Sequence, residues 1–119
     1  MLALWFWQKV PTMTLFVVSY CHPDEAGWRQ HIMAHVGYLK QLLAQGVLRA
    51  SGPMPGEADR RAMLIIAAPD RTALDAIVAA DPFAIEGLIE DMTVAEWDPI
   101  FGAFNSDSSM AGQAIAQPA

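Results

Sequence analysis

Cysteine is nearly absent from this sequence, whose 119 residues include only Cys21. One cysteine excludes an intrachain disulfide, so an apolar core and backbone hydrogen bonds must hold the fold. It also fits a reducing compartment, and we therefore expect a cytoplasmic protein with an unreactive Cys21 near a strand end. Hydrophobic residues make up 54% of the chain, which suffices for a single domain of this length to build such a core.

Basic residues are scarce as well. Seven Lys and Arg stand against 13 Asp and Glu, which gives a formal net charge of −6. Arg60 and Arg61 form an isolated pair in a predicted turn, and the sequence has no cluster of basic residues. Nucleic acids and anionic membranes are bound through several cationic contacts. We therefore expect neither a nucleic acid nor a membrane as partner.

Long hydrophobic runs are missing too, because none approaches the roughly 20 residues that span a bilayer. The apolar opening Met1–Trp7 lacks the basic start and small-residue cleavage site of a signal peptide. Two interpretations of an N-terminal extension over residues 1–12 stay open. It is either an upstream start before a domain that begins near Met13, or an edge segment whose tryptophans pack on that domain.

Signature motifs of several enzyme classes do not occur. The sequence has no phosphate-binding glycine loop and no dinucleotide fingerprint. Ser51 is not embedded in the Gly-x-Ser-x-Gly turn of a serine nucleophile. We expect a protein that works without a cofactor.

Apolar segments and their boundaries predict the order β-α-β-β-α-β. Segments rich in β-branched and aromatic residues predict strands at 13–20, 47–51, 63–67 and 88–97. A helix is expected from the break at His22–Glu25 to about Gln45, where Gly46 would be its C-cap. A second helix is expected from Asp70 to Ala80, followed by a short helical turn at 81–83. Residues 105–119 have few bulky apolar side chains and predict a disordered tail.

This order is that of the ferredoxin-like class, an α+β fold in which both helices pack on one face of an antiparallel sheet. We expect the domain to occupy residues 13–104. Its strands are apolar runs rather than alternations of apolar and polar residues, which predicts that the second sheet face is covered as well. A second copy of the chain is the simplest cover.

His35 occupies a position where the helical pattern calls for an apolar residue. The spacing of four and three puts it on one helix face with four apolar residues, namely Trp28, Ile32, Leu39 and Leu42. A buried imidazole needs partners for its ring nitrogens. An ionised carboxylate at Asp81 is a candidate partner, although Asp81 followed by Pro82 is also a good helix N-cap. The two roles are compatible.

His31 and His35 are four residues apart and could both ligate a metal ion from one helix face. A metal site would need further ligands, for which His22, Asp24 and Asp81 are the candidates. The zinc-protease pattern and a cysteine pair are both missing. We therefore expect no metal, and His31 is expected at the partly solvated edge of its helix.

Ser51, Gly52 and Pro53 stand at the end of the second strand, with Ser51 as its last residue. Turn chemistry accounts for the glycine and proline but does not require the serine. A hydroxyl at a strand end could orient a substrate, and we predict that these three residues bind substrate.

Four short motifs together resemble the YCII-related (YciI-like) family over about residues 13–102. They are His35–Leu39, Gly46 with Ser51–Pro53, Asp81–Phe83, and Thr93-Val94-x-x-Trp97. The resemblance implies a dimeric α/β-barrel, in which the sheets of two ferredoxin-like subunits pack face to face. It also implies an active site built on a His–Asp pair, which falls on His35 and Asp81. The family looks like a relative of muconolactone isomerases, and one member type removes HCl from a chlorinated hydroxyquinol.

Three hypotheses about function follow. The leading one is a small enzyme, a lyase or isomerase of aromatic breakdown, in which His35 is the acid/base and Asp81 fixes its tautomer. The second is a non-catalytic dimer that binds a small molecule or assists another protein. The third is a metal-binding module based on His31 and His35.

Overall fold

The structure is a computed structural model that describes residues 13–112. Within that range it confirms the predicted ferredoxin-like order of strands and helices. Residues 1–12, predicted as an extension, and residues 113–119 of the predicted tail lie outside the described residues.

The four strands form one antiparallel sheet in the order β2-β3-β1-β4. Their bounds are Thr14–Cys21 for β1, Leu48–Pro53 for β2, Ala62–Ala68 for β3 and Glu90–Trp97 for β4. β2 differs from the prediction because it includes Gly52 and Pro53, which were expected in a loop. Pro53 is tolerated there because β2 is an edge strand, where a missing N–H interrupts no central ladder.

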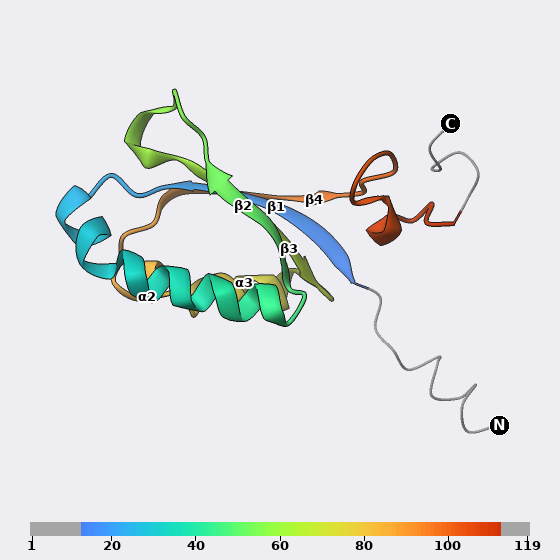
Figure 1. The fold of residues 1–119 in the computed structure, drawn as a ribbon, viewed down its shortest axis with the longest axis horizontal. Coiled ribbons are helices and arrows are strands. Elements are labelled where there is room, and N and C mark those ends of the chain that lie inside the picture. The colour runs from blue at the N-terminus through green and yellow to red at the C-terminus, as the bar shows by residue number, and fades with distance from the viewer. Residues whose placement is uncertain (1–12, 113–119) are drawn as a thin grey trace, which may run out of the picture.

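The helices α2 (Glu25–Ala44) and α3 (Arg71–Ala79) lie on the same face of the sheet (Figure 1). Each begins at an aspartate whose side chain accepts a hydrogen bond from the first turn. Asp24 accepts from the Gly27 N–H at 3.0 Å, and Asp70 accepts from the Ala73 N–H at 2.8 Å. The Tyr38 hydroxyl joins the two helices by donating to the Ile77 carbonyl at 2.6 Å.

The main core lies between these helices and the sheet. It is built by residues that alternate along β1 and β3, together with one side chain from each long helix and one from β2. These are Phe16, Val18, Tyr20, Leu42, Leu48, Leu64, Ile66, Ala68 and Leu74. Because β1 is central and buried on both faces, its sequence is a continuous apolar run.

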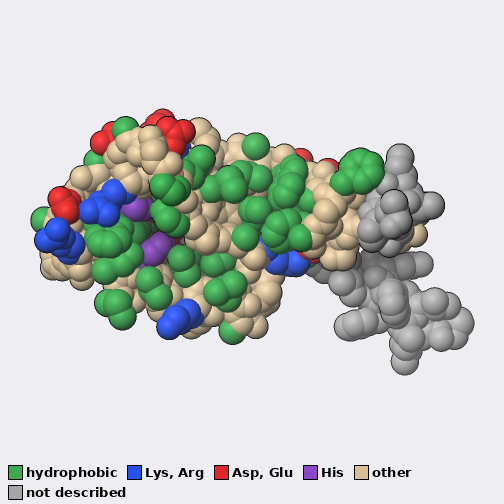
Figure 2. Space-filling view, turned by 45° about the horizontal axis from the view of Figure 1, so that its top comes forward, with side chains coloured by type: hydrophobic (Ala, Val, Ile, Leu, Met, Phe, Trp, Pro, Cys, Tyr) green, Lys and Arg blue, Asp and Glu red, His purple; other side chains and the backbone are tan. Residues whose placement is uncertain are grey.

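The face of the sheet opposite the helices is covered in part by the C-terminal segment, residues 99–112. Phe104 packs on a small cluster formed by Leu15, Ile65 and Ala67, and its ring meets Trp97 edge-on at 5.9 Å. Figure 2 brings this face toward the viewer and shows hydrophobic side chains gathered on it.

The structure differs from the expectation of disorder over residues 105–112. Asn105–Asp107 form a 3-10 helix, η2, and Arg49 donates to the Asp107 carboxylate at 2.6 Å. Asp98 also accepts hydrogen bonds from the backbone and hydroxyl of Ser109. Composition alone missed this segment, because Phe104 anchors it from just before the predicted boundary and the remaining contacts are polar.

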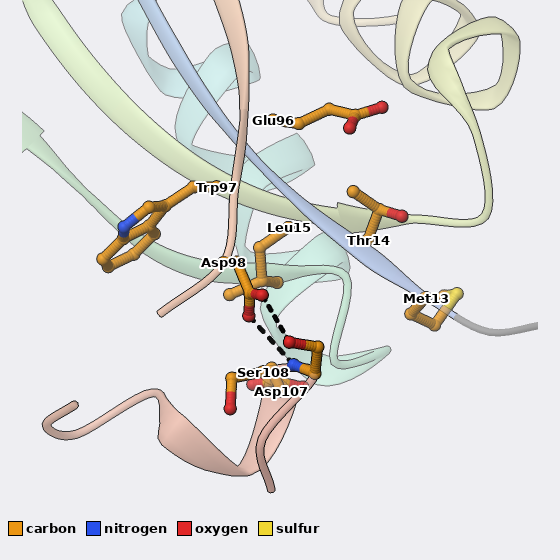
Figure 3. A pocket seen from close by; sticks show the side chains of 9 residues that line it. Met13, Thr14, Leu15, Glu96, Trp97, Asp98, Asp107 and Ser108 are labelled. Atoms are coloured by element: carbon orange, nitrogen blue, oxygen red, sulfur yellow. Dashed lines mark hydrogen bonds between the residues drawn. The ribbon is translucent and has the colours of Figure 1, made fainter. Parts of the chain in front are cut away.

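This segment bounds a hollow of about 430 Å³ between the start of β1 and the end of β4 (Figure 3). Its polar lining includes Glu96 and Asp98 at the end of β4 and Asp107, Ser108 and Ser109 of the C-terminal segment, beside Leu15 and Trp97. Among the described residues, no histidine or other nitrogen base lines this hollow. Among the described helices, none is long and apolar enough to span a membrane.

Candidate active site

The structure brings His35 and Asp81 into direct contact, although 46 residues separate them in the sequence. The His35 Nδ1 atom lies 2.8 Å from both carboxylate oxygens of Asp81. Both side chains are buried, with 8% of His35 and 4% of Asp81 exposed. An ionised carboxylate can only accept a hydrogen bond, so we infer that an Nδ1–H group of His35 donates to Asp81. The other ring nitrogen, Nε2, is then left as an acceptor on the opposite side of the ring.

Asp81 is held in place by the helix that it caps. It is the N-cap of the short helix α4 (Pro82–Ile85), and its Oδ1 atom accepts from the Phe83 N–H at 2.9 Å. The preceding helix α3 ends at Ala79, so the chain turns directly into the position that faces His35 on α2. The cap and the contact with His35 thus occur together in the structure.

Phe83 fixes the plane of the His35 ring. The two rings stack with centroids 4.0 Å apart and an angle of 5° between their planes. Phe83 is completely buried. The stack limits rotation of the imidazole about its side-chain bonds, so Asp81 and Phe83 together set its orientation. The sequence motif contained Phe83, but nothing in the periodicity indicated this contact.

His22 is a third candidate group, which the sequence suggested only as a metal ligand. It lies directly after β1, its ring contacts Phe83 at 5.3 Å and Tyr20 at 5.8 Å, and only 8% of the residue is exposed. Its Nδ1 has no hydrogen-bond partner among the described residues. Burial is the main cause that lowers the pKa of His22, and a hydrogen bond to the backbone of His22 itself acts in the opposite direction. His22 is therefore a neutral imidazole near neutral pH.

This neutral state predicts that acid destabilises the protein through His22. In the unfolded chain the imidazole protonates near pH ~6.5, whereas in the folded protein its pKa is lower. The unfolded state then binds more protons, so the free energy of unfolding falls as the pH drops through this range. Denaturant unfolding between pH ~7.5 and ~5.5 should show a smaller loss in His22→Phe than in the original protein. Equal losses in both proteins would contradict the buried neutral state.

His22, His35 and Phe83 line one cavity of about 420 Å³. Figure 2 shows histidine side chains (purple) among hydrophobic ones. The opposite wall comes from the edge strand β2 and the loop that follows it. There the three predicted substrate-binding residues, Ser51, Gly52 and Pro53, all line the cavity. Most of the predicted apolar stripe of α2 faces this space, since Trp28, Ile32 and Leu39 line it as well. Leu39 also packs on the main core.

The residues considered as metal ligands do not converge. His31 points to Glu86, with Nε2 3.9 Å from a carboxylate oxygen, while Asp24 caps α2. Over residues 13–112, no group of three or more His, Cys, Asp or Glu side chains is arranged to hold a metal ion. Cys21 is buried, as a free thiol, next to His22 in the sequence.

Two tyrosines beside the pair remain protonated. Burial raises the pKa of Tyr20, and the nearby Asp81 charge raises it further. The same two causes, in the same order, raise the pKa of Tyr38. Both phenols therefore act as neutral neighbours of Asp81 and not as bases.

The solved structures that are similar to this one include two bacterial proteins. One is 5-chloro-2-hydroxyhydroquinone dehydrochlorinase from Burkholderia phenoliruptrix, in complex with 2,5-dihydroxybenzoquinone. It has 22% sequence identity and a TM-score of 0.61, and the match covers 71% of this chain and 93% of that one. The other is a protein from Shewanella oneidensis with 15% identity and a TM-score of 0.47, covering 75% of this chain and 93% of that one. A search of curated proteins found no match.

The family model of the YCII-related domain matches residues 13–98 of this chain. This range includes all four strands and both long helices, and it contains His22, His35 and Asp81. It ends before the C-terminal segment that packs on the outer sheet face. The matched range is well over half of the chain, and the fold agrees with it. The chain belongs to the YCII-related family.

Proposed function

We propose that this protein is a cofactor-independent enzyme that transfers protons on a small cyclic or aromatic-derived substrate. The observation that carries this proposal is the buried contact between His35 and Asp81 beside an apolar cavity. In this proposal His35 is the catalytic acid/base and Asp81 is a positioning residue. Ser51, Gly52 and Pro53 contact the substrate from the opposite wall.

The contact gives His35 the properties of a general base. With its proton on Nδ1, the ring offers the Nε2 lone pair to a molecule in the cavity. When Nε2 takes a proton, the imidazolium forms next to the Asp81 carboxylate, which stabilises it. Stacking on Phe83 keeps the ring in one orientation through the proton transfer.

Such a base supports two related reactions. In an elimination, His35 removes a proton from carbon or oxygen, the freed electron pair forms a double bond, and the leaving group departs with its own pair. In an isomerisation, His35 removes a proton from one carbon and returns it to another. The dehydrochlorinase of similar fold makes elimination of HCl the first reaction to test.

Turnover assays test this proposal. The protein should convert at least one member of a panel of chlorinated hydroxyquinols, hydroxylated aromatics and lactones, whereas His35→Gln should not. Glutamine can still donate a hydrogen bond to Asp81, so the fold is retained while the titrating base is lost. Saturable binding without turnover in the original protein would favour a non-catalytic ligand-binding or accessory protein instead.

We further propose that the protein forms a homodimer through the sheet face opposite α2 and α3. The C-terminal segment covers only part of this face. Met63 and Trp97 remain 39% and 37% exposed there, next to the half-buried Val17. A contiguous apolar surface of this kind favours association in water.

A further inference from the structure

The cavity that contains the two histidines has apolar walls and a positively charged rim. Most of its lining side chains are apolar or aromatic. Its charged lining residues, among those described, are Arg60, Arg61 and a single carboxylate, Glu57. The whole chain has only seven Lys and Arg and a net charge of −6. Two of these few cationic side chains therefore lie at one cavity, although the net charge of the molecule is negative.

Arg60 is held at this rim by an unusual backbone. Asp59 and Arg60 both adopt left-handed conformations, with φ of 61° and 54°. Non-glycine residues take this conformation at an energetic cost and keep it where other contacts hold them. One such contact is the hydrogen bond from the His22 N–H to the Asp59 carbonyl, at 3.1 Å. The loop that presents Arg60 is thus tied to the backbone of His22, which lines the same cavity.

The Arg60 side chain lies across the cavity-lining Trp28. Its guanidinium carbon is 4.4 Å from the centre of the Trp28 ring, a distance at which a cation is attracted to the ring face. This contact fixes the guanidinium plane without using any of its N–H donors. An immobilised, planar donor group is well suited to bind two oxygens of an anion.

Arg60 keeps donors free for such a ligand, whereas Arg61 does not. Arg61 donates to the Ser19 hydroxyl at 2.7 Å and pairs with the Asp91 carboxylate. Arg60 has one ion pair, at 3.2 Å, to the half-exposed Glu25. The same Glu25 oxygen accepts from Arg29 at 2.9 Å. Two cations therefore share one carboxylate, and this surface group retains a positive charge.

We propose that Arg60 binds an anionic oxygen of the substrate, so that the substrate class is a planar ring with a carboxylate or an ionised hydroxyl. The ring contacts the apolar walls, and the anionic oxygen lies at the rim beside Trp28. This inference rests on the proposed function for its site, but it concerns binding and is testable without turnover.

Calorimetric titration of the full chain with salicylate and with salicylamide tests the proposal. The two probes share a hydroxylated ring, and only salicylate carries a carboxylate. We expect salicylate to bind about tenfold more tightly than salicylamide in the original protein, as a charge-assisted hydrogen bond would give. Arg60→Gln should remove this preference. Arg71→Gln is the matched control, since Arg71 has a similar exposed ion pair, to Asp75, but lies on α3 away from the cavity.

Two further readouts keep the test decisive. Arg60→Lys retains the charge but lacks the planar fork, so the preference should be intermediate even if the Gln variant folds poorly. The preference should also shrink between about 0.01 M and about 1 M salt, because the site is partly exposed. Equal affinities in the original protein, a preference that survives in Arg60→Gln, or no binding of either probe would overturn the proposal.

The binding result is independent of the proposed reaction. Asp81→Asn leaves Arg60 unchanged and should therefore keep the preference for salicylate. If the preference depends on Arg60 but no compound is turned over, the anion site stands and the enzymatic proposal fails. If turnover occurs without any preference, the anion site fails and the enzymatic proposal stands.

Discussion

Asp81→Asn is expected to lower the rate of the proposed reaction by about 10²- to 10⁴-fold, the range that general acid–base catalysis contributes. Asparagine keeps the shape of the N-cap and can still accept from the Phe83 N–H. Its amide group, however, lacks the charge that stabilises the imidazolium. It can also present an N–H to Nδ1, which would move the ring proton to Nε2 and remove the lone pair from the cavity.

Asp70→Asn is the matched control, because Asp70 makes the same kind of cap at the start of α3 and has no histidine partner. It should change the rate by less than about twofold, in keeping with a substitution outside the acid–base pair. Steady-state rates of the two variants, with folding verified by circular dichroism, make the comparison. A similar loss of rate in both would attribute the effect to the fold, and full activity in Asp81→Asn would contradict the role given to Asp81.

Val17→Lys is expected to convert the proposed two-fold dimer into a monomer or an unfolded chain. Val17 lies on the central strand β1, on the same face as Leu15, and pairs with Ile65 on one side and Ala95 on the other. A lysine there would place a charge in the middle of the proposed interface, where it has no carboxylate partner. Burial of an unpaired charge costs several kcal/mol, roughly 3–5, which is enough to disrupt association.

Sedimentation velocity at micromolar concentration measures this effect. Met33→Lys is the control, since Met33 is apolar and 77% exposed on α2, on the helical side of the molecule. It should sediment as the original protein does. A folded monomer in the original protein would contradict the dimer, and an unchanged dimer in Val17→Lys would place the interface elsewhere.

The contact at the centre of the site was accessible to sequence reasoning because both partners carry local signals. His35 interrupts an apolar stripe, and Asp81 precedes a proline in a pattern that is typical of an N-cap. The remaining parts have no such signal. His22 follows a strand, and Arg60 lies in a loop that looks like an ordinary polar turn. Only the pairing of β1 with β3 brings these two segments together beside α2.

The same contrast holds for the fold: elements set by local sequence were predicted, whereas packing set by long-range contacts was not. Strand and helix order follow from apolar periodicity and capping residues, and the structure reproduces them within two residues at the strand ends. The packing of the C-terminal segment does not follow from composition. Phe104 reaches Leu15 and Ile65 on strands far away in the sequence, and a segment with one aromatic residue and several polar contacts resembles a disordered tail.

The position of the proton on the His35 ring tests the account most directly. Nitrogen NMR of the histidine rings distinguishes a neutral imidazole protonated at Nδ1 from one protonated at Nε2. We predict that His35 in the original protein carries its proton on Nδ1, bonded to Asp81, and that Asp81→Asn removes this preference. A proton on Nε2 in the original protein, or the same tautomer in both proteins, would contradict the proposed base.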